Sequence, residues 1–164
     1  MSRTIPVEPL TRAGFADFGA VIEASGSPSF MINAGRCGRF HDLARPEWSG
    51  EEGAVALSVA RSDAVSLPLE LDLLERHPLG SQAFIPMNGT QFIVIVAPDE
   101  NGRPGRPKAF LANGAQGIQY NANCWHGVLA PLDGPSDFLI VDRVGKGANL
   151  EEHALDAPYT IVLE

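Results

Sequence analysis

Beyond residue 28 the chain consists mainly of short apolar runs bounded by Gly, Pro, Asn and Asp. Short runs between turn-forming residues are typical of β-strands and not of long helices. The pattern predicts strands at residues 30–33, 55–61, 69–75, 82–87, 92–97, 108–112, 118–120, 124–129, 138–143 and 159–163. Because strands at this spacing commonly close on themselves, we expect an all-β barrel or jelly roll.

Two of these strands differ in how their apolar positions are arranged. Val55, Leu57 and Val59 alternate with small residues, so we expect these three side chains to face the core. Residues 92–97 are apolar without interruption. That pattern predicts a central strand covered on both faces.

One short helix and several loops complete the pattern. Thr11 is a suitable N-cap, Phe15 and Phe18 follow at nearly helical spacing, and Gly19 ends the run. A dense cluster of turn residues at 99–107 predicts an exposed hairpin tip. Residues 46–53 and 133–136 are expected to form further surface loops.

Composition limits the class of protein. The 164 residues, 45% hydrophobic and 20% charged, suit a single folded domain spanning residues 1–164 and exclude a disordered chain. The net charge of −8, without a Lys and Arg cluster, argues against nucleic-acid and membrane partners. No apolar run approaches the roughly 20 residues of a membrane span, and the first residues lack a signal core. We therefore expect a cytoplasmic protein, with Cys37 and Cys124 as buried, reduced thiols.

The densest group of reactive side chains lies at residues 75–89. In an extended strand Glu75 and His77 point to one face and Arg76 to the other, and Gln82 returns to the first face across a turn. If that face lines the barrel interior, three polar groups converge there. The alternative is that His77 caps the turn before Pro78 while the charged side chains are solvated.

A second candidate is His126, which lies between Trp125 and Gly127. A histidine beside a large aromatic residue is often a hydrogen-bonded core residue. Taken together, the two segments resemble the paired motifs of the cupin barrels, a jelly-roll family. In that comparison Glu75 and His77 take the two histidine positions of the first motif, Gln82 takes its glutamate position, and His126 is the histidine of the second.

The cupin resemblance implies a possible metal site formed by Glu75, His77, Gln82 and His126. Typical metal-binding cupins offer three histidines and a glutamate, whereas this set holds only two imidazoles and an amide in place of the carboxylate. Two histidines and one carboxylate suffice for a divalent ion with open positions. We expect either no cofactor or a divalent metal such as nickel or zinc. Neither NAD nor ATP is expected, because no GxGxxG or phosphate-binding GxxxxGK[ST] motif is present.

Longer strings of the sequence resemble one specific family. The segments 31–35, 39–44, 125–126 and 137–143, together with ERHPLGSQAFIPM at residues 75–87, are similar to the successive motifs of ureidoglycolate lyase. The resemblance implies a cytoplasmic, homodimeric cupin of allantoin and purine breakdown. Such a carbon–nitrogen lyase splits ureidoglycolate into glyoxylate and urea.

This reaction requires a base, an acid and a cation for the substrate carboxylate. His77, or otherwise His126, is the expected base, with Glu75 beside it either raising its pKa or pairing with an arginine. Gln82 suits the urea group because an amide both donates and accepts hydrogen bonds. The candidates for binding the carboxylate, or for otherwise lining the pocket, are Arg76, Arg39, Arg61, Arg143, Asn33 and His41.

Other interpretations remain open at this level. Arg76 points away from His77 along the strand, which suits a subunit interface or a second sheet instead. His153 is expected to be solvated on a short acidic turn or helix, with no chemical role. The chain would also fit a non-catalytic cupin that binds a small carboxylate, or a ureidoglycolate hydrolase that releases ammonia.

Overall fold

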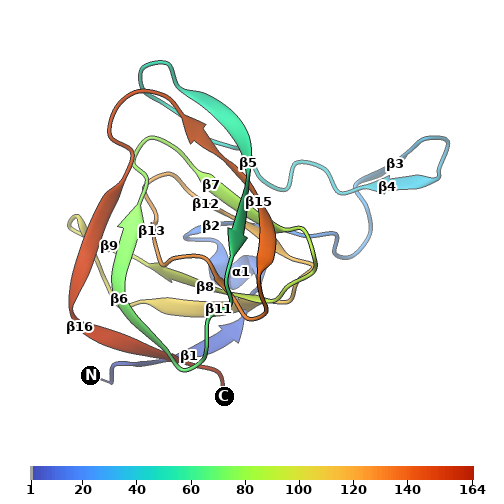
Figure 1. The fold of residues 1–164 in the computed structure, drawn as a ribbon. Coiled ribbons are helices and arrows are strands. Elements are labelled where there is room, and N and C mark those ends of the chain that lie inside the picture. Colours follow the sequence, from blue (N-terminus) through green and yellow to red (C-terminus); the bar gives the residue numbers. More distant parts are fainter. Residues whose placement is uncertain (1) are drawn as a thin grey trace.

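A computed structural model describes residues 2–164, and nearly all of its regular structure is β (Figure 1). Six strands close into a barrel of mixed direction, in which β1 runs parallel to both of its neighbours. Around the barrel the order is β1 (Thr4–Pro9), β16 (Glu151–Val162), β6 (Leu69–Arg76), β13 (Trp125–His126), β8 (Phe92–Ala97) and β11 (Lys108–Ala112), which pairs with β1 again. The short strand β14 (Ala130–Pro131) extends the edge of β8. The expected all-β, cupin-like barrel is confirmed.

A five-stranded antiparallel sheet faces one side of this barrel. Its order is β2 (Gly19–Ile22), β12 (Gly117–Tyr120), β7 (Gln82–Pro86), β15 (Ser136–Val144) and β5 (Ala54–Ser62). The turn-rich segment at 99–107 forms the hairpin of β9 (Asp99–Glu100) and β10 (Arg103–Pro104), as expected. A second hairpin, β3 (Phe30–Ile32) and β4 (Cys37–Arg39), projects away from the body of the protein beyond the five-stranded sheet (Figure 1).

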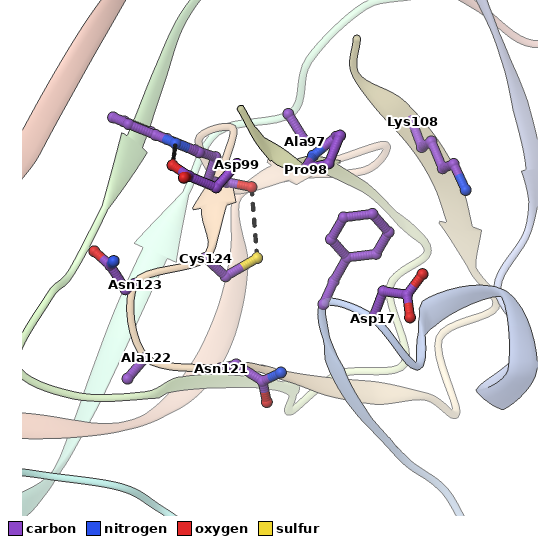
Figure 2. A pocket seen from close by; sticks show the side chains of 11 residues that line it. Asp17, Ala97, Pro98, Asp99, Lys108, Asn121, Ala122, Asn123 and Cys124 are labelled. Carbon is purple, nitrogen blue, oxygen red and sulfur yellow. Dashed lines mark hydrogen bonds between the residues drawn. The ribbon is translucent and has the colours of Figure 1, made fainter. Parts of the chain in front are cut away.

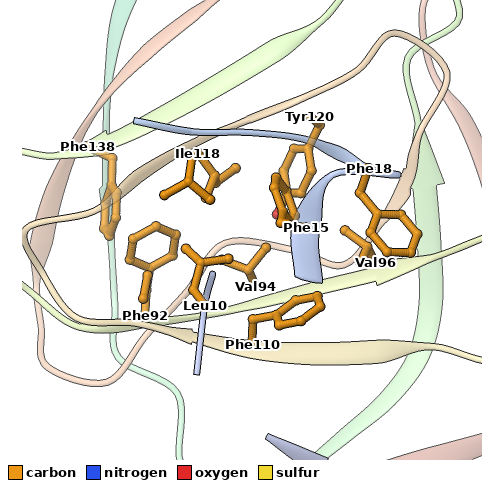
Figure 3. Packing of buried hydrophobic residues seen from close by; sticks show 12 residues of the cluster. Leu10, Phe15, Phe18, Phe92, Val94, Val96, Phe110, Ile118, Tyr120 and Phe138 are labelled. Carbon is orange, nitrogen blue, oxygen red and sulfur yellow. The ribbon is translucent and has the colours of Figure 1, made fainter. Parts of the chain in front are cut away.

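Two apolar clusters hold these layers together, and β8 belongs to both. Phe92, Val94 and Val96 pack between the barrel and the five-stranded sheet, where aromatic side chains from both layers meet (Figure 3). The alternate residues Ile93 and Ile95 pack into the second cluster, whose members come from all six barrel strands. Every residue of β8 is buried, so the prediction of a strand covered on both faces is confirmed.

The helix α1 (Arg12–Phe15) is shorter than the pattern suggested. Thr11 caps it by accepting a hydrogen bond from Gly14 N at 3.0 Å, and Phe15 and Phe18 are both buried. The chain then enters β2 at Gly19. A Cβ at this position would lie 1.7 Å from the carbonyl oxygen of Gln119, so only glycine allows the two strands to approach so closely. No helix of residues 2–164 is long and apolar enough to span a membrane.

The predicted orientation of the strand at 55–61 was wrong. Leu57 and Val59 are 71% and 57% exposed, whereas Ala56 and Ala60 of β5 are half-buried. Ala60 pairs with Phe138, which is fully buried, and a larger residue than alanine would compete with it for space. The alternation was read correctly, but the neighbouring strand decides which face is inside.

Other predicted strand boundaries were wrong because pairing between distant strands outweighs local composition. Of residues 124–129 only Trp125 and His126 form a strand, β13, and the short strand β14 follows this segment at Ala130. The last strand begins at Glu151, because its polar first half pairs with the end of β6, so His153 lies in a strand with its ring against Trp125. Strands β1 and β2 were missed, and the prolines of β1 weaken its strand pattern.

Candidate active site

The side chains of Glu75, His77 and His126 meet beside the barrel wall. Glu75 lies near the end of β6, directly opposite His126 of β13, and His77 follows β6 by one residue. One ligand atom of each residue lies within 4.8 Å of the others. His77 Nε2 is 3.9 Å from Glu75 Oε1, and the two imidazole centroids are 5.2 Å apart. The structure therefore brings together the three residues predicted to be catalytic.

Backbone carbonyls orient both imidazole rings. His77 Nδ1 is 2.8 Å from the carbonyl oxygen of Asn149, and His126 Nδ1 is 2.9 Å from that of Gly127. A carbonyl can only accept, so each Nδ1 carries the hydrogen and each neutral ring keeps a lone pair on Nε2. Within residues 2–164 neither buried Nε2 atom has a hydrogen-bond partner. Two basic nitrogens are thus directed to the same place as a carboxylate.

The three groups differ in burial, and therefore in how readily each carries charge. His126 is only 2% exposed, and burial lowers the pKa of its imidazole to about 4. Burial also raises the pKa of the Glu75 carboxyl, although the neighbouring His77 partly opposes this. The side chains of His77 and Glu75 remain 19% and 27% exposed, so solvent reaches this part of the site.

Polar groups of the five-stranded sheet face the cluster. Gln82 of β7 pairs in register with Tyr120 of β12 and Asp142 of β15. Its Nε2 donates to Asp142 Oδ2 at 3.0 Å, while its Oε1 is buried without a partner in the described chain. The Tyr120 ring stacks on His126 with centroids 4.3 Å apart and planes 7° apart. Gln82 is therefore held at one end and free to bind at the other.

Arg76 and Arg143, which were predicted to bind substrate, are engaged elsewhere. Arg76 lies 4.3 Å over the ring of Trp125 and pairs with Asp99 and Glu151. Arg143 is 7% exposed and donates to the backbone carbonyl oxygens of Ser49, Glu51 and Lys146. Strand alternation turns Arg76 away from His77, and three backbone oxygens hold Arg143, so both side chains are engaged away from the cluster.

The other predicted binding residues do not join the cluster either. Arg61 forms an exposed pair with Asp137. Asn33, Arg39 and His41 lie on or beside the projecting β3–β4 hairpin, and all three are exposed. Within residues 2–164, none of these four residues forms a hydrogen bond or ion pair with Glu75 or His77.

A separate cavity of about 450 Å³ lies beside Cys124 and Trp125 (Figure 2). Asp17 and Lys108 line one side, and Asn121 and Asn123 line another. Burial raises the pKa of the Cys124 thiol to about 12, so this thiol stays protonated and is a weak nucleophile. Both cysteines are free. Cys37 is exposed, whereas the sequence predicted a buried thiol.

Three residues of the site escaped the sequence reasoning: Tyr120, Asp142 and Asn149. Asp142 was detectable, because a carboxylate in the apolar run 138–144 shares the inward face with Phe138 and Ile140. Tyr120 and Asn149 gave no comparable signal. Their roles depend on how distant segments meet in space.

The cluster also fits a divalent metal ion. The donors are the Nε2 atoms of two imidazoles and one partly buried carboxylate. Backbone carbonyls accept hydrogen bonds from the two Nδ1 atoms and so orient the rings, as they do in many metal sites. Gln82 Oε1 is a further unpartnered oxygen nearby in the fold. The residues predicted as ligands from the sequence are therefore chemically suitable.

Comparison with known proteins supports the same family over the whole chain. A family model described as ureidoglycolate lyase matches residues 2–162. A ureidoglycolate lyase of Chelativorans sp. (strain BNC1) is 55% identical over 161 residues, which cover 98% of each chain. Ureidoglycolate lyase 2 of Rhizobium meliloti (strain 1021) is 50% identical, with 96% of each chain covered. A ureidoglycolate lyase of Rhodobacter capsulatus is also 50% identical, over 94% of this chain and 96% of the relative. Because the family model matches residues 2–162 and these relatives are matched over nearly their whole length, the chain belongs to the ureidoglycolate lyase family.

Proposed function

We propose that this protein is a carbon–nitrogen lyase that cleaves ureidoglycolate into glyoxylate and urea, a step of allantoin and purine breakdown. The observation that carries the proposal is the match of residues 2–162 to the family, together with relatives of that name at about half identity. The cluster of Glu75, His77 and His126 supplies chemistry suited to this reaction.

The reaction needs one proton transfer and one bond cleavage. The substrate carbon bears a hydroxyl, a carboxylate and a urea nitrogen. The O–H and C–N bonds break, a C=O bond forms, and the proton passes from the hydroxyl oxygen to the departing nitrogen. The atoms balance without water or a redox carrier, so one positioned base that also returns the proton is sufficient.

His77 is the better base of the two histidines. Its Nε2 carries the lone pair, and its ring is partly solvated, so it can accept a positive charge. Glu75 Oε1 at 3.9 Å stabilises that imidazolium. Burial lowers the pKa of His126 to about 4, so its ring stays neutral near pH 7. We assign proton transfer to His77 and a neutral, orienting role to His126.

Gln82 is proposed to bind the urea end of the substrate. Its unpartnered Oε1 accepts an N–H hydrogen, while the bond from Nε2 to Asp142 fixes the orientation of the amide. An acceptor held in this way distinguishes a urea N–H from a carboxylate oxygen, which can only accept and would repel it.

A divalent ion, if bound, would be held by Glu75, His77 and His126, with Gln82 at the edge of the site. Its contribution would be Lewis-acid stabilisation of negative charge on the substrate oxygen. Exhaustive chelation followed by elemental analysis separates the two cases. Activity that is lost and then restored by nickel or zinc supports a metal-dependent reaction at this cluster, and full activity without metal supports proton transfer by His77.

We further propose that the protein is a cytoplasmic homodimer. The apolar outer face of β5, with Leu57 and Val59 largely exposed, supports association because such faces are usually covered. Light scattering at micromolar concentration should give about twice 17.5 kDa. A monomeric mass would contradict this part of the proposal.

Product analysis tests the function directly. Purified protein should release equimolar urea and glyoxylate from one enantiomer of ureidoglycolate. Ammonia as the first nitrogen product would indicate a hydrolase. Tight glyoxylate binding without turnover of either enantiomer would indicate a carboxylate-binding protein and contradict the proposal.

A further inference from the structure

The projecting hairpin is largely exposed in the described part of the chain. We call residues 28–41, which include β3 and β4, the arm. These two strands pair only with each other, and every residue from 33 to 39 is exposed. A two-stranded hairpin is at best marginally stable alone in water. An arm of this kind needs a second surface against which to pack.

The tip of the arm has an unusual backbone. Asn33, Ala34 and Gly35 take left-handed conformations in succession, with φ of 54°, 56° and 79°. For alanine this conformation costs roughly 1–2 kcal/mol, so the shape of the tip is maintained against a local preference. Strained backbone of this kind gathers at ligand-binding and contact sites.

The arm also has a defined chemical character. Phe30 and Met31 are 43% and 52% exposed. The Arg39 guanidinium lies 5.9 Å from the centroid of the Phe30 ring, and the His41 ring lies 5.3 Å from it. The arm contains no Asp or Glu, and Arg36 is its only other full charge. In a chain of net charge −8, the arm is a cationic and apolar surface.

The candidate active site, in contrast to the arm, is short of positive charge. Its substrate carries a carboxylate, yet no lysine or arginine of the described residues forms a hydrogen bond or ion pair with Glu75, His77, Gln82 or His126. A second carboxylate borders the cluster instead, because Glu152 of β16 pairs in register with Glu75 of β6. One chain therefore assembles the proton-transfer groups but not the cation that the carboxylate requires.

Resting on the proposed function, we propose that the arm of a second copy of this chain docks at the active site and that its Arg39 binds the substrate carboxylate. Charge complementarity between the arm and the site supports this arrangement. An apolar landing point exists as well, because Leu150, 51% exposed, follows Asn149, whose carbonyl orients His77. Each active site is then composite, with Glu75, His77 and His126 from one copy and Arg39 from the other.

Subunit complementation tests this inference. Arg39→Ala should raise KM for ureidoglycolate at least tenfold, and His77→Asn should abolish turnover. A heterodimer of the two variants, co-expressed with different tags and purified through both, contains one intact composite site of two. It should recover about half of the wild-type rate per dimer. Measured as kcat/KM, recovery below 5% would show that the arm acts within its own chain, and wild-type kcat/KM in the Arg39→Ala homodimer would show that Arg39 does not act at the site; either result would overturn the proposal.

Control variants separate the possible failures. Arg36→Ala changes the other arginine of the arm and should leave KM within threefold of wild type, whereas a larger effect there than at Arg39 would overturn the assignment to Arg39. If wild-type protein turns over ureidoglycolate but the heterodimer does not, the arm proposal fails and the lyase stands. If the wild type is inactive, the function fails, and docking of the arm is then tested through Cys37.

Cys37 reports docking without any measure of activity. Its side chain is exposed in the single chain, within β4. Alkylation at Cys37, followed by peptide mass spectrometry, should be at least tenfold slower in the dimer than in a synthetic peptide of residues 28–41. An equal rate would show that the arm is free in the dimer and would overturn the docking.

Discussion

Arg76→Met separates a structural arginine from a substrate-binding one. The Arg76 side chain is 13% exposed and is held between Trp125, Asp99 and Glu151. Methionine keeps the apolar stem and removes the charge, the stacking and both ion pairs. The planar guanidinium of Arg76 also made it a candidate for binding the substrate carboxylate, so the two assignments predict different results.

The magnitude follows from the contacts. A largely desolvated cation–π contact at 4.3 Å contributes up to about 2 kcal/mol. Asp99 and Glu151 are 47% and 49% exposed, so solvent weakens their pairs with Arg76 and they add little. For a domain of this size, a loss of about 2 kcal/mol lowers Tm by roughly 4–8 °C.

The assay is thermal unfolding combined with steady-state kinetics on the folded variant. We expect the lower Tm with kcat/KM within threefold of wild type. Arg61→Met is the matched control, because its pair with Asp137 is solvent-exposed, and it should leave Tm unchanged. An unchanged Tm for Arg76→Met, together with a large rise in KM, would refute the structural assignment.

Three further predictions concern the core, the dimer and the pH dependence. Ile118→Ala, at a fully buried position, should lower the free energy of unfolding by about 2–5 kcal/mol in chemical denaturation; a loss below 1 kcal/mol would contradict the packing of the first cluster. Leu57→Ser should weaken the dimer in dilution experiments while leaving the far-ultraviolet spectrum unchanged, and an unaffected dimer would exclude the outer face of β5 from the interface. The third prediction concerns chelator-treated protein, in which burial lowers the pKa of His126 from 6.5 to about 4. Because the unfolded chain then binds the proton at a higher pH than the folded one, the stability of the fold decreases as the pH falls from about 6.5 to 4. At pH 5 this loss is about 2 kcal/mol relative to pH 7; His126→Gln should remove most of it, and an identical pH profile in that variant would contradict the burial of a neutral imidazole.

The sequence predicted most of the fold because strand and turn signals are local. The segment 92–97 coincides with β8, and 108–112 coincides with β11. The outward face of β5 was not predictable, since alternation defines two faces but not which of them meets Phe138. The same limit applies to β1, which is held by parallel pairing to β11 and β16 from distant parts of the chain.

Part of the candidate site was predictable for a related reason. Glu75 and His77 share a face by strand geometry alone, and the family resemblance joined them to His126. The arginines were harder to assign, because the sequence shows a guanidinium but not its partners. Arg143 is bound to three backbone carbonyl oxygens from two loops, which no local pattern reveals.

The most direct test of the central claim compares His77→Asn with wild-type protein in the conversion of ureidoglycolate to urea and glyoxylate. Asparagine keeps a polar group at this position but cannot transfer the proton, and loss of general acid–base catalysis typically costs about 100- to 10,000-fold in rate. We predict a fall in kcat of at least 100-fold, with KM little changed and the fold retained. A fall of less than tenfold in the folded variant would contradict the assignment of proton transfer to His77.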